Sequence, residues 1–110
     1  MVMATGSVKA VFPVGAESGN GGYCKLPDGT LLQWGSLTVL NGSYIANDTF
    51  PIPFYNKNKV AISLCPTAST VGMDYNVNWS SLTTTNLSVG RTPNTTDNTF
   101  YWTAIGRWKA

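Results

Sequence analysis

The sequence contains no histidine, and only 11% of its 110 residues are charged. Without histidine the chain cannot form a Ser-His-Asp triad, and it lacks the commonest general base and metal ligand. A glycosidase needs two carboxyl groups about 5–9.5 Å apart, and an Asp pair formed across a subunit boundary stays open as the source of both. We therefore expect no enzyme, no cofactor and no metal centre, with calcium held by loop carbonyls and Asp as the open alternative. The carboxylates are few: Glu17, Asp28, Asp48, Asp74 and Asp97.

The chain also lacks a basic stripe and a long apolar segment. Its net charge is only +2, and its Lys and Arg residues are scattered, which argues against a nucleic-acid partner. No segment approaches the roughly 20 apolar residues of a membrane span, and the N-terminus does not resemble a secretory signal. We expect no membrane insertion. The spacing of Cys24 and Cys65 demands no disulfide, so we expect reduced thiols.

Strand patterns dominate what is present. Thr, Asn, Ser and Gly are frequent, and these residues form helices poorly. Residues 59–65 alternate between apolar and small or polar side chains, as in a half-buried strand. Turn signals at regular intervals indicate an all-β fold, an antiparallel β-sandwich. The strands expected are Thr30–Leu40, Asp48–Ile52, Lys59–Cys65, Tyr75–Ser80, Asn86–Arg91 and Thr99–Arg107.

One domain is expected over residues 22–110, preceded by a glycine-rich linker over residues 1–21. Trp34 and Trp102 are expected in its core, and Gly35 is a candidate β-bulge. The strand 99–107 is bulky on both faces, so it is either covered on both sides or placed at an oligomer contact. Aromatic residues make up 12% of the chain. That is more than a thin core hides, and an exposed apolar patch usually marks an interface.

Loops at one end of the expected sandwich are the candidate binding region. If the strands run up and down, alternate loops share one end, which brings together loops 41–47, 66–74 and 92–98. Aromatic rings there can cover the C–H face of a sugar, while amides, carboxylates and Arg hydrogen-bond its hydroxyl groups. Each candidate has a structural alternative in packing, an ion pair or a turn. The candidates for a glycan site are Tyr44, Asp74, Tyr75, Arg91, Asn94 and Asp97.

Three motifs in fixed order carry a resemblance to a known family. They are Gly22-Tyr23-Cys24-Lys25-Leu26-Pro27-Asp28-Gly29 leading into Gln33-Trp34-Gly35, then Thr49-Phe50-Pro51, then Phe100-Tyr101-Trp102-Thr103-Ala104-Ile105-Gly106. Together they resemble the C-terminal tip domain of bacteriophage tail fibres, marked by Leu-Pro-(Asn/Asp)-Gly followed by Gln-Trp-Gly. Tailocins, the contractile phage-tail bacteriocins, use the same kind of module.

The resemblance implies a fold similar to H-type lectins, a six-stranded antiparallel sandwich that assembles as a homotrimer. It implies a receptor-binding tip at the distal end of a virion tail fibre, made in the host cytoplasm and joined to the rest of the fibre through its N-terminus. Residues 1–21 are then either a linker or the end of the fibre shaft. The implied ligand is a bacterial surface glycan such as lipopolysaccharide. H-type lectins use a His at their sugar site, which this sequence lacks, so specificity does not carry over. A structural trimerisation cap without a ligand site is the alternative.

Overall fold

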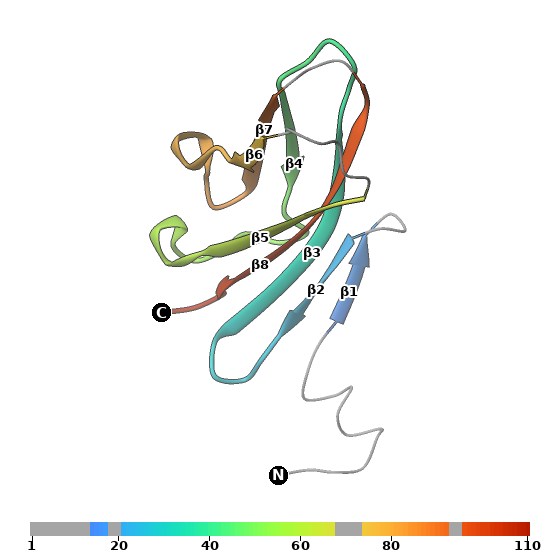
Figure 1. Ribbon diagram of the computed structural model, residues 1–110. Coiled ribbons are helices and arrows are strands. Elements are labelled where there is room, and N and C mark those ends of the chain that lie inside the picture. Colours follow the sequence, from blue (N-terminus) through green and yellow to red (C-terminus); the bar gives the residue numbers. More distant parts are fainter. Residues whose placement is uncertain (1–13, 18–20, 68–73, 93–95) are drawn as a thin grey trace.

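The chain folds into two antiparallel sheets (Figure 1). The computed structural model describes residues 14–17, 21–67, 74–92 and 96–110. The five-stranded sheet comprises, in spatial order, β1 (Val14–Glu17), β2 (Gly21–Lys25), β3 (Thr30–Val39), β8 (Asn98–Arg107) and β5 (Ala61–Pro66). The three-stranded sheet comprises β4 (Ile45–Thr49), β7 (Asn86–Thr92) and β6 (Asp74–Val77). The short 3-10 helices η1 (Lys57–Lys59) and η2 (Trp79–Ser81) lie in connections, and no described helix has the length and apolar character to span a membrane.

The prediction of an all-β antiparallel fold is confirmed. The expected count of six strands was too low, because the described residues also form the β1–β2 hairpin. The sequence of this hairpin is glycine-rich and does not alternate between apolar and polar residues, so the strand pattern did not predict it. The strand expected over residues 48–52 lies earlier, at β4, since Pro51 has no N–H and the ladder with β7 ends at Thr49. The segment expected as a linker contributes β1.

One hydrophobic core draws on both sheets. Trp102 is 2% exposed and lies in the core, as predicted. The ring of Phe50 packs edge-on against its indole, with the two ring centres 5.5 Å apart. Trp34 is 38% exposed on the outer side of β3, so its predicted place in the core is wrong. Other buried members of the cluster come from β3, β7 and β8, from the segment after β4 and from the connection before β7: Leu31, Leu37, Val39, Phe54, Leu82, Leu87, Val89, Phe100 and Ala104.

Gly35 is required by a close approach. The β3–β8 ladder continues through the pair Gly35 and Trp102, so the predicted bulge is absent. A Cβ on Gly35 would lie 2.7 Å from Cζ2 of Trp102. The glycine therefore makes room for the indole of its cross-strand neighbour.

Gln33, beside Trp34 in the Gln-Trp-Gly motif, is fully buried and ties the sheet to the Phe50–Phe54 segment. Its Nε2 donates to the carbonyl of Ile52 at 2.8 Å, and its Oε1 accepts the N–H of Ile52 at 2.9 Å. Both backbone groups of Ile52 are thus satisfied in a segment that two prolines exclude from the ladders.

The Pro27-Asp28-Gly29 turn joins β2 to β3. Gly29 has φ +101°, a conformation that favours glycine. Asp28 Oδ1 accepts the N–H of Thr30 at 2.8 Å. That backbone bond is the main reason why the pKa of Asp28 lies below its usual value, and the nearby Arg107 guanidinium lowers it further. Trp108 Nε1 donates to the carbonyl of Leu26 at 2.9 Å, which fastens the end of the chain to this turn.

Replacing Gly29 by Ala should destabilise the domain more than replacing Gly42, the other glycine with positive φ. Both variants carry the backbone strain, about 1–2 kcal/mol. At Gly29 the added Cβ also overlaps the Arg107 guanidinium and disturbs its 2.7 Å bond to the Asp28 carbonyl, whereas at Gly42 nothing lies within 4 Å. Urea denaturation of the two variants separates the strain from the crowding. Equal losses would contradict a role for the Arg107 contact.

The two cysteines lie on different strands of the five-stranded sheet. Cys24 is on β2 and Cys65 on β5, with β3 and β8 between them. Three strand spacings amount to about 14 Å, twice the reach of a disulfide. Both thiols are free, as predicted.

Candidate ligand-binding site

The loops at one end of the molecule are fastened to one another. Asn41 follows β3, and Asp97 immediately precedes β8. The N–H of Asn41 donates to Asp97 Oδ1 at 2.6 Å. The N–H of Arg91 on β7 donates to the carbonyl of Tyr44 at 2.8 Å. This end lies away from the β2–β3 turn and the C-terminus (Figure 1). The loop clustering expected from an up-and-down chain is therefore present for the described residues.

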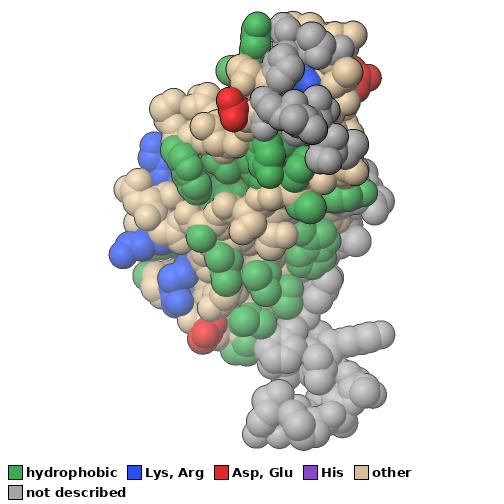
Figure 2. Space-filling model, viewed as in Figure 1, with side chains coloured by type: hydrophobic (Ala, Val, Ile, Leu, Met, Phe, Trp, Pro, Cys, Tyr) green, Lys and Arg blue, Asp and Glu red, His purple; other side chains and the backbone are tan. Residues whose placement is uncertain are grey.

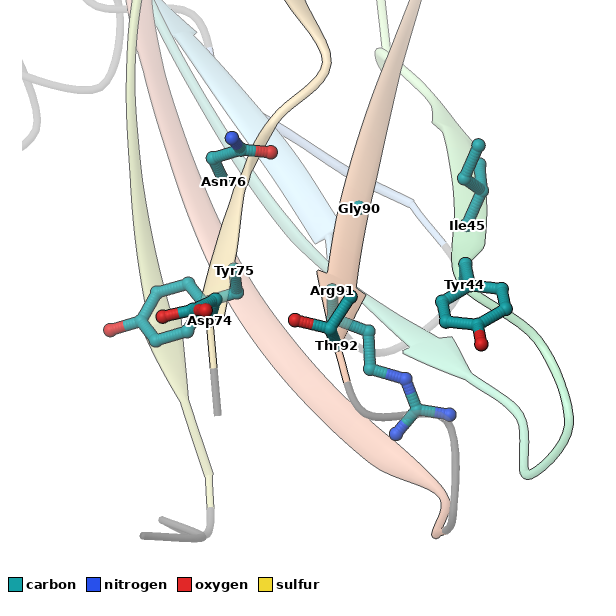
Figure 3. Close-up of a pocket in the computed structure, with 8 residues that line it drawn as sticks. All are labelled: Tyr44, Ile45, Asp74, Tyr75, Asn76, Gly90, Arg91 and Thr92. Atoms are coloured by element: carbon teal, nitrogen blue, oxygen red, sulfur yellow. The ribbon is translucent and has the colours of Figure 1, made fainter. Parts of the chain in front are cut away.

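An open hollow of about 330 Å³ lies at this end, on the outer face of the three-stranded sheet (Figure 3). Its floor is Gly90 on the central strand β7. The ladder places Ile45 of β4 on one side of Gly90 and Asn76 of β6 on the other. The residues that line the hollow are Tyr44, Ile45, Asp74, Tyr75, Asn76, Gly90, Arg91 and Thr92.

The hollow exists because position 90 carries no side chain. Its backbone does not need glycine, since φ at Gly90 is not positive. Packing does not need it either, because a Cβ would meet its nearest neighbours, Asn76 Oδ1 and the Tyr44 carbonyl, at 3.7 and 3.8 Å, which is ordinary contact. Glycine inside a strand costs stability and often marks a place where a ligand or another backbone approaches. Gly90 fits that description.

Three polar side chains stand at the rim of the hollow. The side chains of Asp74, Asn76 and Thr92 are exposed, and the described residues offer them no hydrogen-bond partner. They project from the outer face of β6 and β7, whereas Ile45 gives the opposite wall an apolar surface (Figure 3). Carboxylate, amide and hydroxyl groups beside an apolar wall can bind a polyhydroxylated ligand.

The guanidinium of Arg91, by contrast, is not free to bind a ligand. Arg91 is 3% exposed, and its guanidinium points away from the hollow toward the loops (Figure 3). Nη2 donates to the carbonyls of Leu40 and Ser43 at 2.8 and 3.1 Å, and Nη1 donates to Asn98 Oδ1. Its polar atoms therefore hold the β3–β4 loop in place. The alternative of a structural role is the one that the geometry supports, although through backbone carbonyls and an amide rather than an ion pair.

The remaining predicted residues divide as follows. Tyr44 and Asp74 line the hollow. Tyr75 also lines the hollow, but the Tyr75 ring packs on the ring of Phe100, with the two ring centres 5.3 Å apart. Asp97 caps the N–H of Asn41 and lies outside the hollow. Asn94 lies outside the described residues.

Sequence reasoning missed four lining residues, which are Ile45, Asn76, Gly90 and Thr92. A usable signal was present for one of them, since glycine is unfavourable inside a strand and Gly90 lies within the strand expected over residues 86–91. The others are ordinary exposed strand residues until their neighbours are known. Among the described His, Cys, Asp and Glu residues, no group of three or more could hold a metal ion.

Comparison with known proteins gives one family match and two similar structures. The family described as tail fiber protein gp53-like, C-terminal, matches residues 25–107. Among curated proteins, none matches this chain. An N-truncated R2-type pyocin tail fiber is similar with a TM-score of 0.66 and 27% identity, over 93% of this chain and 41% of that one. A P. aeruginosa R2 pyocin fiber has a TM-score of 0.64 and 24% identity, over 96% and 30%. The chain thus spans less than half the length of these fibres.

Proposed function

Because the chain belongs to the family of gp53-like tail fibre C-terminal domains, the domain type shared by phage and pyocin fibres, we propose that it is a receptor-binding tip. In this proposal it stands at the distal end of a virion or tailocin fibre and recognises a bacterial surface glycan such as lipopolysaccharide. It acts by binding and not as an enzyme. Residues 22–110 form the tip together with β1, which pairs with β2, and the segment before β1 leads to the rest of the fibre.

The observation that carries the proposal is the Gly90 hollow, whose rim carries polar side chains that make no hydrogen bond to the described residues. Two features support its use as a ligand site. It lies at the end away from the β2–β3 turn, and β1 pairs antiparallel with β2 so that Val14 lies opposite Cys24, near that turn. The chain therefore enters β1 from the opposite end, which leaves the hollow free to face a cell surface.

A homotrimer is the second part of the proposal, and the outer face of the five-stranded sheet supports it. Trp34, Tyr101 and Ile105 project from this face and are 38, 56 and 45% exposed. The register places Leu32, Cys24 and Ala61 in one row with Ile105. Figure 2 shows hydrophobic side chains over this sheet on the face in view. An apolar face of this kind usually marks an interface, and three copies of a weak site on one rigid tip would bind a repetitive glycan with avidity.

The absence of catalysis is proposed on the composition of the hollow. Asp74 is the only carboxylate among its lining residues, whereas glycoside hydrolysis uses a pair. The structural trimerisation cap remains the competing function, because the apolar face would serve it equally well and it needs no hollow. A sandwich of the H-type lectin kind is proposed on the resemblance of the motifs.

Gly90→Val tests the site. Valine suits a strand, and its Cβ has room, so the domain should fold with its stability changed by less than about 1 kcal/mol. Its methyl groups fill the hollow, and binding to lipopolysaccharide from a susceptible host should weaken at least about tenfold, or 1.4 kcal/mol. Binding of the full chain is measured on immobilised lipopolysaccharides from candidate hosts.

Asn47→Val is the matched control. Asn47 is exposed on the same face of the three-stranded sheet, one row from Gly90, and does not line the hollow. The Asn47→Val substitution introduces the same valine side chain as Gly90→Val, and it should leave binding to lipopolysaccharide unchanged. If the Gly90→Val variant bound lipopolysaccharide as tightly as the unaltered chain, the hollow would not be the binding site. No saturable binding by the folded, unaltered chain to any lipopolysaccharide would favour the structural cap.

A further inference from the structure

We infer that the Gly90 hollow selects an uncharged sugar residue and rejects anionic ones, such as uronic acids and phosphorylated sugars. This inference rests on the proposed function and names the ligand class of the same site. It concerns the sign of charge at the rim. Bacterial surface glycans contain both uncharged and anionic residues, so this choice decides which part of the surface is bound.

No described cation is free to meet an anion in the hollow. Arg91 is the only Lys or Arg among the lining residues. Its N–H groups are spent on Leu40, Ser43 and Asn98, inside the protein. The neighbouring sequence adds none, because residues 68–73 and 93–95 contain no Lys or Arg.

A carboxylate takes the place of a cation at the rim. Asp74 is exposed, lines the hollow and has no partner among the described residues. Asp97 adds a second negative charge at the same end. At separations of about 4 Å near a protein surface, two like charges repel by roughly 1–4 kcal/mol. An anionic sugar beside Asp74 meets this repulsion and finds no free N–H donor on a described Lys or Arg of the hollow, since those of Arg91 are used within the protein.

Apart from Arg91, the positive charges described below lie at the other end of the domain. Lys25 and Lys109 each place Nζ 5.0 Å from the centre of the Trp108 ring. Arg107 donates to the carbonyl of Asp28 in the β2–β3 turn. Lys57 and Lys59 follow in η1, and Figure 2 shows Lys and Arg side chains along this flank of the molecule. The exposed cations thus lie away from the proposed tip, where Asp74 is the exposed charge that lines the hollow.

The other lining groups suit hydroxyls. Asp74 can accept two hydroxyl hydrogen bonds, and the Asn76 amide both donates and accepts. Ile45 and the exposed Tyr44 ring offer apolar surface to a C–H face on the opposite wall (Figure 3). Neutral hexose or N-acetylhexosamine residues present this combination of groups. We therefore assign the hollow to that class of sugar.

Asp74→Asn tests the assignment because it keeps the shape and removes the charge. The probes are immobilised oligosaccharides of neutral hexoses and N-acetylhexosamines, beside hexuronate-containing and phosphorylated ones. The unaltered chain should bind neutral probes only. In the Asp74→Asn variant, affinity for the anionic probes should rise about tenfold relative to the neutral ones, as expected when close like-charge repulsion is removed.

Asp28→Asn is the control for net charge. It makes the same change at an exposed carboxyl at the far end of the domain, and the ratio between probe classes should stay as in the unaltered chain. Preference of the unaltered chain for anionic probes, or an unchanged ratio in Asp74→Asn, would overturn the inference. If Gly90→Val still abolishes that binding, the receptor site stands and only its ligand class is wrong. Binding that survives Gly90→Val overturns the site and the inference together.

Discussion

Arg91→Ala is expected to lower the free energy of unfolding by about 3 kcal/mol or more. The substitution leaves the buried Asn98 amide and the partly buried carbonyls of Leu40 and Ser43 without their donor, and a buried group left unsatisfied costs about 1–3 kcal/mol. The β3–β4 loop, which carries Tyr44, loses its anchor. Urea denaturation at a fixed protein concentration measures the loss.

Lys57→Ala is the control for removing a cation. Lys57 is exposed in η1, so its loss should change stability by less than about 0.5 kcal/mol. A loss below about 1 kcal/mol for Arg91→Ala would contradict the structural role. The expected result has a practical consequence. Lost glycan binding in an Arg91 variant would report a disordered loop and would not identify a sugar contact.

Trp102→Ala is expected to cost about 3–5 kcal/mol, the usual range for truncating a buried Trp. The indole fills the space above Gly35, contacts Phe50, and donates from Nε1 to Asp48 Oδ2 at 2.9 Å. Truncation leaves a cavity between the sheets and removes the partner of a carboxylate. The midpoint of urea denaturation should fall with little change in slope.

Two further variants divide this loss. Trp102→Phe keeps most of the ring but cannot donate to Asp48, and should cost about 1–2 kcal/mol. Trp79→Ala removes the same residue type from a site that is 53% exposed and should cost less than about 1 kcal/mol. A loss in Trp102→Ala no greater than in Trp79→Ala would contradict the packing described here.

The residues of the motifs that carry the family resemblance stabilise the fold and do not form the candidate binding site. Gln33 satisfies the backbone of Ile52, and Gly35 makes room for Trp102. Gly29 supplies the positive φ of the β2–β3 turn. None of these residues lines the hollow. The motifs could therefore be read from the sequence, and they identify the family, but they carry no information on the ligand.

The candidate site was predictable in part. The up-and-down order of strands brought the loops that carry Tyr44 and Asp74 to one end, and both residues line the hollow. The same reasoning included Arg91 and Asp97, whose polar atoms are used within the protein. Polar residues near loops suit binding and capping equally, and only their partners distinguish the two.

The sequence alone determined the class of fold, which follows from the local alternation of side chains and from the turn signals between the strands. It placed Trp34 and Trp102 alike in the core, and only the structure separated the two. The absence of His was also settled at that level. Each of these conclusions depends on residues close together in the chain or on composition.

Only the tertiary structure decided where Trp34 points, what Arg91 holds and that a hollow exists. Alternation shows which residues of a strand share a face, but not which face is buried. The hollow needs Ile45, Gly90 and Asn76 side by side, and they come from separate strands whose register is set by long-range pairing. Register depends on the packing of the whole sheet, so the absence of a side chain at Gly90 acquired its meaning only once its neighbours were in place.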